Sequence, residues 1–123
     1  MPRILHFEVY ADDPARAQKF YNEIFGWKFD KWEGPWEYWM AKTGEDKQPG
    51  INGGLMKRMP GQPTGMINYI DVPSVDEFSK KIQSKGGKII KPKTPIPGIG
   101  NFAICMDTEE NLFAIIQPDQ NVL

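Results

Sequence analysis

The feature that most constrains the fold of this chain is a pattern that occurs twice, with a period near 60 residues. Each copy consists of a strand, a helix and three further strands, and Gly26 after the first helix corresponds to Gly87 after the second. Residue identity between the halves is poor, so the repeat lies in the pattern of elements. The sequence predicts an α+β fold of two βαβββ modules in a single domain, with module one at about 1–58, a linker at about 59–65 and module two at about 66–123.

The first half carries clear start and stop signals. Residues 4–10 alternate as in a strand, which puts Leu5, Phe7 and Val9 on one face and His6, Glu8 and Tyr10 on the other. A helix is predicted to begin at Asp13-Pro14 and to end at Gly26. Its apolar stripe consists of Ala17, Phe20, Tyr21, Ile24 and Phe25. Strands are expected at about 27–32, 36–42 and 51–58.

The second half repeats this order with weaker signals. A strand at 66–72 precedes a helix that begins at Pro73-Ser74 and runs to about Lys85. Three strands are predicted to follow, near 88–92, 100–106 and 111–117. Pro92, Pro95, Pro97 and Gly98 predict a loop between the first two of these strands.

Composition excludes several classes of function. Fifteen basic and sixteen acidic residues give a net charge of −1, which provides no basic patch for nucleic acid or an anionic membrane. Cys105 is the single cysteine, so an intrachain disulfide and a cysteine-based zinc cluster are impossible, and a buried structural thiol is favoured over a nucleophile. No apolar run approaches the roughly 20 residues of a membrane helix, and the start lacks a secretory cleavage site. We therefore expect a cytoplasmic protein.

The run His6-Phe-Glu-Val-Tyr-Ala-Asp-Asp-Pro-Ala-Arg-Ala-Gln-Lys-Phe-Tyr-Asn-Glu-Ile-Phe-Gly-Trp27 resembles the first strand and helix of the glyoxalase/bleomycin-resistance/dioxygenase superfamily, the vicinal oxygen chelate fold. Lys85-Gly86-Gly87 and Asp107-Thr-Glu-Glu-Asn-Leu-Phe113 are similar to its second-half segments. The resemblance implies paired modules whose strands form a curved mixed sheet around a cavity, with the helices outside. It also implies a homodimer and a small-molecule ligand.

The resemblance further implies a metal site with one ligand on each of four inner strands. The first ligand position falls on His6, and its counterpart in module two falls on Met66. The last strand of module one places Gly53 or Gly54 at the third position, and Ala114 takes the fourth. These last three positions lack nitrogen or oxygen donors, and one histidine is not a metal site. We expect no metal and no cofactor, with His6 as the one retained ligand-like residue.

His6 and Glu8 are the candidate catalytic residues. They lie two apart on one strand face, so they could form an acid–base pair or supply two ligands. Each also has a structural interpretation. His6 is equally well explained as a hydrogen-bonded residue at a cavity mouth or dimer contact, and Glu8 as a carboxylate paired with a lysine or arginine.

An aromatic stretch, Trp27 to Trp39, suggests either a pocket for a flat or apolar ligand or, more commonly, core packing and a subunit interface. Alternation puts Trp36, Tyr38 and Met40 on one face and Trp39 on the other. By module symmetry, Met66, Asn68 and Ile70 are expected to face inward with Phe102, Ile104 and Met106. The predicted ligand-binding set is Trp36, Tyr38, Asn52, Met56, Asn68, Phe102 and Ile104.

Two functions remain open at this point. The first is a protein that binds a small organic molecule in the cavity without a complete catalytic metal site. The second is a diverged enzyme, a lyase, isomerase or dioxygenase relative, possible without metal if His6 and Glu8 carry the chemistry. The missing ligands favour the first modestly, because the metal-dependent reactions need an ion to polarise the substrate.

Overall fold

The computed structural model describes residues 2–62 and 64–123, and the chain divides into two compact units. The N-terminal unit comprises His6–Met66. The C-terminal unit comprises Ile67–Leu123 together with the N-terminal residues up to Leu5. Among the described residues, no helix has both the length and the apolar character needed to cross a membrane.

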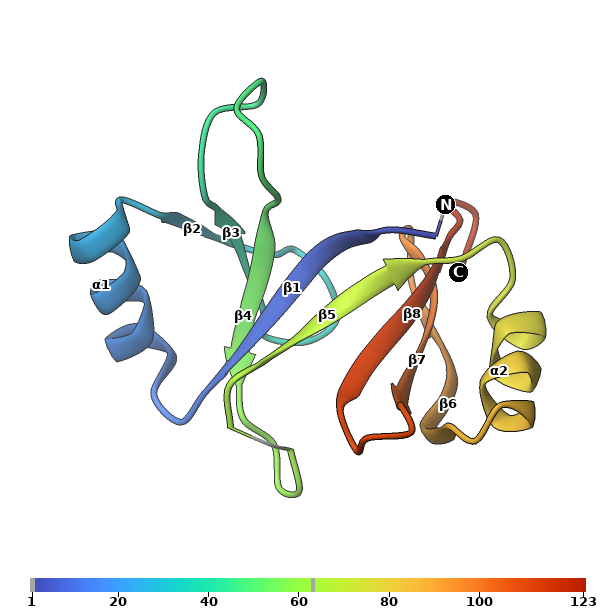
Figure 1. The fold of residues 1–123 in the computed structure, drawn as a ribbon. Helices are drawn as coiled ribbons and strands as arrows, with labels where there is room; N and C mark the ends of the chain where they lie inside the picture. The colour runs from blue at the N-terminus through green and yellow to red at the C-terminus, as the bar shows by residue number, and fades with distance from the viewer. Residues whose placement is uncertain (1, 63) are drawn as a thin grey trace. The chain divides into compact units, whose positions relative to one another are not determined.

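The N-terminal unit has the order strand, helix, strand, strand, strand (Figure 1). Its elements are β1 (Ile4–Ala11), α1 (Pro14–Phe25), β2 (Lys28–Lys31), β3 (Trp39–Lys42) and β4 (Gly53–Lys57). The strands follow the spatial order β2-β3-β4-β1. β4 runs parallel to β1, whereas the other neighbours are antiparallel, so the last strand of the unit returns beside the first.

The C-terminal unit repeats this topology. Its elements are β5 (Met66–Asp71), α2 (Val75–Ser84), β6 (Lys88–Ile96), β7 (Gly100–Met106) and β8 (Leu112–Pro118). The spatial order is β5-β8-β7-β6, and β8 runs parallel to β5. The predicted α+β class with two βαβββ modules is therefore confirmed.

The chain start belongs to the C-terminal unit because hydrogen bonds connect it to the end of β5. The backbone N–H of Arg3 donates to Asp71 Oδ1 over 2.6 Å, and the N–H of Asp71 donates to the Arg3 carbonyl over 2.9 Å. The predicted linker at about 59–65 follows β4, and its Pro63 lies outside the described residues. The module boundaries remain predictions.

Helix α1 begins and ends where the sequence predicts. Asp13 accepts a hydrogen bond from the N–H of Arg16 over 3.1 Å, and Gly26 takes a left-handed conformation with φ of 75°. The predicted apolar stripe is only partly right. Ala17 and Tyr21 pack against the sheet, but Phe20, Ile24 and Phe25 are 57–61% exposed. A single helix lying on a sheet buries one narrow side, and Phe20 and Ile24 occupy the neighbouring row of the helix surface.

The strand predicted at 36–42 begins later, at Trp39. The preceding segment is instead a loop, closed by a hydrogen bond from the N–H of Trp32 to the Tyr38 carbonyl over 2.8 Å. Gly34 allows this loop to pack tightly, because a Cβ there would lie 2.1 Å from the Trp32 ring. The strand predicted at 51–58 is likewise shorter, since β4 begins at Gly53 and ends at Lys57.

Strand β6 is longer than predicted. It continues through Pro92 and Pro95, which the sequence had indicated as loop residues, to Ile96. Its pairing with β7 is irregular, with register shifts between Ile89 and Lys91 and again between Lys91 and Thr94. Prolines are tolerated here because β6 is the last strand in the spatial order, where a missing N–H need not break a ladder on both sides.

Each unit has its own hydrophobic cluster, which includes residues from its helix. In the N-terminal unit the buried members are Phe7, Val9, Ala11 and Leu55. In the C-terminal unit they are Val72, Val75, Ala103, Cys105 and Ile115. Cys105 is a buried thiol whose pKa is raised to about 11 by burial, as expected of a structural cysteine.

Candidate functional site

The candidate site lies on the face of β1 opposite the α1-side core. Phe7 and Val9 point into the core, so strand alternation places His6, Glu8 and Tyr10 together on the other face. This face is not solvated, since Glu8 is 6% exposed and Tyr10 is 5% exposed. A buried carboxylate is costly unless it is hydrogen-bonded or paired, so this polar row is unlike ordinary core packing.

Strands β4 and β3 extend the same face. Between β1 and β4, Glu8 is in register with Gly54 and Tyr10 with Met56. On the other edge of β4, Gly54 is in register with Met40 of β3. Residues in register share a face, so Met40 and Met56 supply apolar surface beside the polar row. Gly54 contributes no side chain to this face.

The space beside Gly54 is filled by Tyr38. A Cβ added to Gly54 would lie 1.8 Å from the Tyr38 hydroxyl oxygen, far inside van der Waals contact. From this position the hydroxyl forms a hydrogen bond with His6 Nε2 over 2.8 Å, and the tautomer of the imidazole decides which group donates. The two rings are nearly parallel, with an interplanar angle of 18°. The glycine on β4 thus admits the tyrosine that contacts His6.

Two ionisable side chains of this face, His6 and Tyr10, are held in their neutral forms. Burial lowers the pKa of His6 to about 4, so the imidazole is neutral at pH 7. Burial also raises the pKa of Tyr10, and the charge of Glu8 and a hydrogen bond with Glu8 raise it further. The Tyr10 hydroxyl therefore keeps its proton and donates a hydrogen bond to the Glu8 carboxylate.

Trp36 lies in the loop before β3, where the sequence had placed it on a strand. The Trp32 ring is 5.0 Å from the Trp36 ring and 6.0 Å from the Tyr38 ring, so the three form an aromatic cluster, with distances measured between centroids. Trp36 is 39% exposed, while Tyr38 is 8% exposed. The cluster therefore runs from an exposed indole to the hydroxyl that contacts His6.

The other predicted ligand-binding residues lie elsewhere. In the C-terminal unit, Ala114 on β8 is in register with Tyr69 on one side and with Ile104 on the other. The ring centroids of Tyr69 and Phe102 are 6.3 Å apart. Tyr69 therefore shares a face with Phe102 and Ile104. The expectation that Met66, Asn68 and Ile70 share this face is wrong, because Ile70 is in register with Ile115 in the α2-side core. The faces of β5 are therefore displaced by one residue from those that module symmetry predicts, and Asn68 is exposed.

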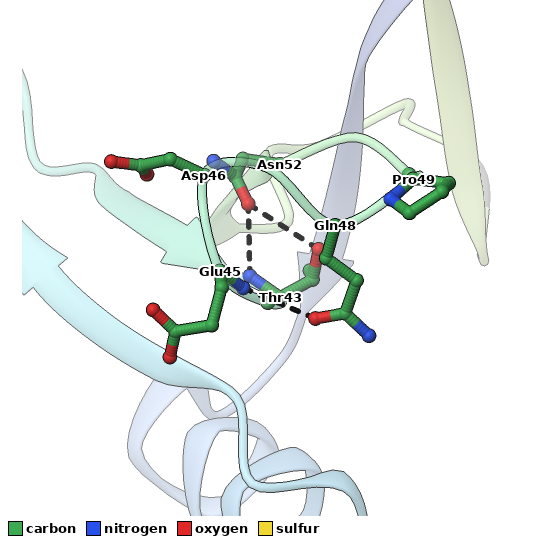
Figure 2. Close-up of a pocket in the computed structure, with 8 residues that line it drawn as sticks. Thr43, Glu45, Asp46, Gln48, Pro49 and Asn52 are labelled. Carbon is green, nitrogen blue, oxygen red and sulfur yellow. Dashed lines mark hydrogen bonds between the residues drawn. The ribbon is translucent and has the colours of Figure 1, made fainter.

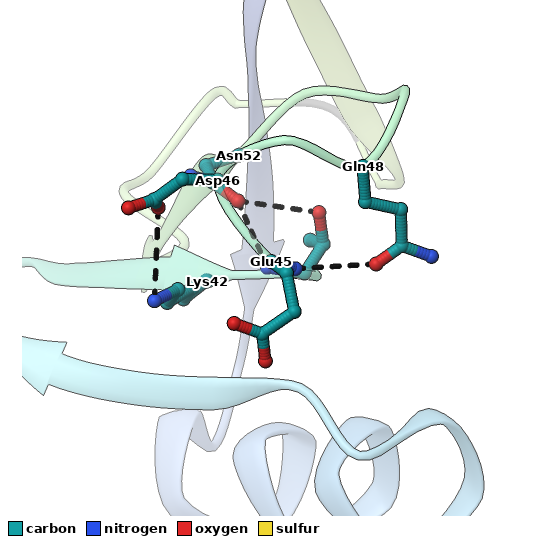
Figure 3. Close-up of polar contacts among 6 residues, drawn as sticks. Lys42, Glu45, Asp46, Gln48 and Asn52 are labelled. Atoms are coloured by element: carbon teal, nitrogen blue, oxygen red, sulfur yellow. Dashed lines mark hydrogen bonds and ion pairs between the residues drawn. The ribbon is translucent and has the colours of Figure 1, made fainter.

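Asn52, also predicted to line the cavity, lies in the loop between β3 and β4. Its Oδ1 accepts hydrogen bonds from the N–H and the hydroxyl of Thr43, over 2.9 and 3.3 Å (Figure 3). The loop encloses a polar pocket of about 160 Å³, and Figure 2 shows the residues that line it. Gln48 Oε1 accepts from the N–H of Glu45 over 3.1 Å, and Lys42 pairs with Asp46 over 3.8 Å. These contacts hold the loop itself together.

Comparison with known proteins identifies the family of the chain. A model described as the Glyoxalase/Bleomycin resistance protein/Dioxygenase superfamily matches residues 3–115. The chain belongs to this superfamily. It is 27% identical over 113 residues to proteins named "Putative glyoxylase CFP32" from Mycobacterium tuberculosis (strain CDC 1551 / Oshkosh) and Mycobacterium bovis. These matches cover 90% of this chain but 42% of each relative, so the chain spans less than half of their length.

Solved structures share the fold of this glyoxalase-superfamily chain. The hypothetical protein BH1468 from Bacillus halodurans C-125 matches with a TM-score of 0.70 at 15% identity, covering 97% of this chain and 96% of that one. Methylmalonyl-CoA epimerase from Mycobacterium tuberculosis matches with a TM-score of 0.67 at 11% identity, covering 94% and 87%. At these identities the likeness concerns the fold alone.

The superfamily resemblance implies a metal site, for which the N-terminal unit offers few donors. The ligand-like positions of this unit are held by His6 and by Gly53 or Gly54, which together supply a single imidazole, and Tyr38 contacts its Nε2. Among residues 2–62 and 64–123, no group of three or more His, Cys, Asp or Glu side chains is arranged to hold a metal ion. This donor set does not fit a metal ion by itself.

Sequence reasoning placed His6, Glu8 and Tyr10 on a shared face of this superfamily strand, and the structure confirms that placement. It did not single out Tyr10 as the hydrogen-bond partner of Glu8, although the spacing of two residues on one strand could have indicated it. It also missed the contact between Tyr38 and Gly54. The glycine was interpreted only as a lost ligand, whereas in the structure it makes room for another side chain.

Proposed function

We propose that this chain binds a small organic molecule at the polar face of β1, without a complete catalytic metal site. The observation that carries the proposal is the row of the partly buried His6 and the buried Glu8 and Tyr10, with Tyr38 against His6. Such groups cost stability in a plain core, and they cluster where proteins bind ligands. A methylmalonyl-CoA epimerase of the same fold was solved with methylmalonyl-CoA bound, so the fold accommodates small organic ligands.

The proposal is tested by ligand-induced stabilisation. Hemithioacetals, catechols, epoxides and acyl-CoA thioesters are added to the chain, and the melting temperature is measured. A ligand at 100 times its Kd stabilises the folded state by about 2.7 kcal/mol, which raises Tm by roughly 10 °C for a domain of this size. We expect His6→Ala or His6→Gln to abolish the rise, and the exposed-helix control Lys19→Ala to retain it. Absence of stabilisation by every class would refute the proposal.

A second candidate function is metal-free catalysis by His6 and Glu8. The observation that favours it is the burial of Glu8 two residues from His6 on one face. The lowered pKa of His6 argues against general-base catalysis by that residue, because an efficient base has a pKa near the working pH. Turnover of a bound ligand, followed by NMR, distinguishes the two functions. Product formation that Glu8→Gln abolishes while the fold is intact would establish the enzyme.

We further propose a homodimer and a cytoplasmic location, both from the superfamily resemblance and the sequence. The exposed Phe20, Ile24 and Phe25 on α1 provide apolar surface consistent with a second copy. Sedimentation equilibrium measures the assembly directly. A mass near 14.1 kDa at micromolar concentrations would exclude the dimer.

A further inference from the structure

We propose that Tyr38 positions His6 for ligand recognition, and that the pair recognises an uncharged hydrogen-bonding group such as a carbonyl or hydroxyl. This inference rests on the proposed function, since it specifies the ligand class of the same face. Tyr38 is a positioning residue here because it acts through the imidazole.

The Tyr38 hydroxyl reaches His6 only by lying where a side chain at Gly54 on β4 would begin, 1.8 Å from an added Cβ. Any other residue at position 54 would displace the phenol and with it the contact to His6. The glycine and the tyrosine therefore form one arrangement, although they come from different elements.

An imidazole and a phenol each contain a donor and an acceptor, so the 2.8 Å bond between His6 and Tyr38 can be made in either direction. A ligand carbonyl accepts a hydrogen bond, and a ligand hydroxyl both accepts and donates one. Either group can therefore bond to His6 or Tyr38 once the direction of the bond between them adjusts. The bond holds Nε2 toward the Tyr38 hydroxyl, with the two ring planes 18° apart.

Glu8 lies two residues from His6 on the same face and is 6% exposed, so its carboxylate is poorly screened by water. A ligand carboxylate or phosphate placed at His6 would meet this like charge. A metal cation at Nε2 would have to displace Tyr38, and Gly54 offers no side-chain donor in return.

Met40 is 42% exposed and shares the face with Glu8, and Trp36 is 39% exposed and packs on Trp32 beside Tyr38. Thioether and indole surfaces suit a flat ring. Benzamide is therefore a suitable probe, because its ring matches this surface and its amide is uncharged and both donates and accepts.

His6 is the single histidine of the chain, so its imidazole signals in an NMR spectrum are unambiguous. The experiment records the 15N and Cε1–H shifts of His6 at pH 7 while benzamide, benzoate, benzylammonium or Zn²⁺ is added to the full chain. We expect benzamide to perturb His6 with at least tenfold higher affinity than benzoate, whose carboxylate meets the charge of Glu8. Benzylammonium, which donates hydrogen bonds but cannot accept them, shows whether the charge of Glu8 alone is enough for binding. Zn²⁺ is expected to give no stoichiometric binding.

Tyr38→Phe tests the positioning role. We expect it to change the tautomer signature of His6 and to weaken benzamide binding at least fivefold, with Tm nearly unchanged. Tyr21→Phe is the matched control, because Tyr21 packs on Trp27 on the α1 side, and it should alter neither readout. Gly54→Ala should reproduce the His6 shift change, which covers the case in which Tyr38→Phe fails to fold.

Several outcomes would overturn the inference: tighter binding of benzoate or benzylammonium, 1:1 binding of Zn²⁺ at His6, no probe binding at all, or His6 shifts unaffected by Tyr38→Phe. These outcomes are separable from failure of the proposed function. A compound that stabilises wild type but not His6→Ala upholds ligand binding on this face, even if Tyr38→Phe shows that the tyrosine does not position the imidazole.

Discussion

At the scale of single residues, the neutral state of His6 has a consequence for stability. Its folded pKa of about 4 is below the unfolded value of 6.5, so the unfolded state binds more protons between these values. The contribution of His6 is complete above pH 6.5 and is lost as the pH falls toward 4.

We predict that wild type loses up to about 3 kcal/mol relative to His6→Gln as the pH falls from about 6.5 to about 4. The physical reason is that the buried imidazole resists the proton that the unfolded chain accepts. Urea unfolding of both proteins across this range measures the difference, and the carboxylates common to both cancel. Parallel curves for the two proteins would contradict the lowered pKa.

Gly54 provides a second prediction at this scale. Gly54→Ala should destabilise the fold by about 1–3 kcal/mol, because the new Cβ would overlap the Tyr38 hydroxyl. In a double-mutant cycle, Tyr38→Ala should remove most of this cost, since it removes the overlapping ring. Denaturant unfolding of the four proteins measures the coupling. Additive effects would show that the two residues are not in contact.

The sequence could predict the members of the polar row but not what lies against it. Alternation along one strand suffices to place His6, Glu8 and Tyr10 on a common face. The contact of Tyr38 with Gly54 depends on the register between strands and on the path of a loop, and neither has a local signal. The register between β5 and β8 has no local signal either, and this is why Asn68 was wrongly placed on the face of Ile104. A shift of one residue moves every side chain of a strand to the opposite face.

At the scale of elements, α1 was the most predictable because its ends have chemical signals. We predict that Asp13→Ala lowers the free energy of unfolding by about 1 kcal/mol, because the N–H of Arg16 loses its acceptor. Asp13→Asn is the matched control, since its side-chain oxygen can still accept. Thermal unfolding compares the two variants, and equal losses in both would show that charge rather than capping is responsible.

Strand ends were less predictable than helix ends. Trp36 and Tyr38 have the residue types of a strand, yet they lie in a loop that is stabilised by packing among its own aromatic rings. Pro92 and Pro95 have the residue types of a loop, yet pairing with β7 extends the strand across them. In both cases tertiary contacts override local preference.

At the scale of the whole molecule, the repeated order of elements was sufficient to predict the two-module fold. The hydrophobic clusters of the two units share no buried residue, although the chain start joins the C-terminal unit. This separation leads to a prediction about combined substitutions.

We predict that Leu55→Ala and Ile115→Ala each cost about 2–5 kcal/mol and that their effects add within about 0.5 kcal/mol. Each side chain is 0–2% exposed in a different cluster, so neither truncation removes a packing partner of the other. Chemical denaturation of the single and double variants measures the sum. A strongly non-additive result would show that the two cores are energetically coupled.

Strand β6 bears on how copies of this chain can associate. It is the outermost strand of the C-terminal unit and carries Lys88, Lys91 and Lys93 along with two prolines. A second β6 laid alongside it would face repulsion between ammonium groups and would lack two amide donors. Continuous sheet growth through this edge is thereby disfavoured, which protects a concentrated solution of the protein from forming fibrils along it.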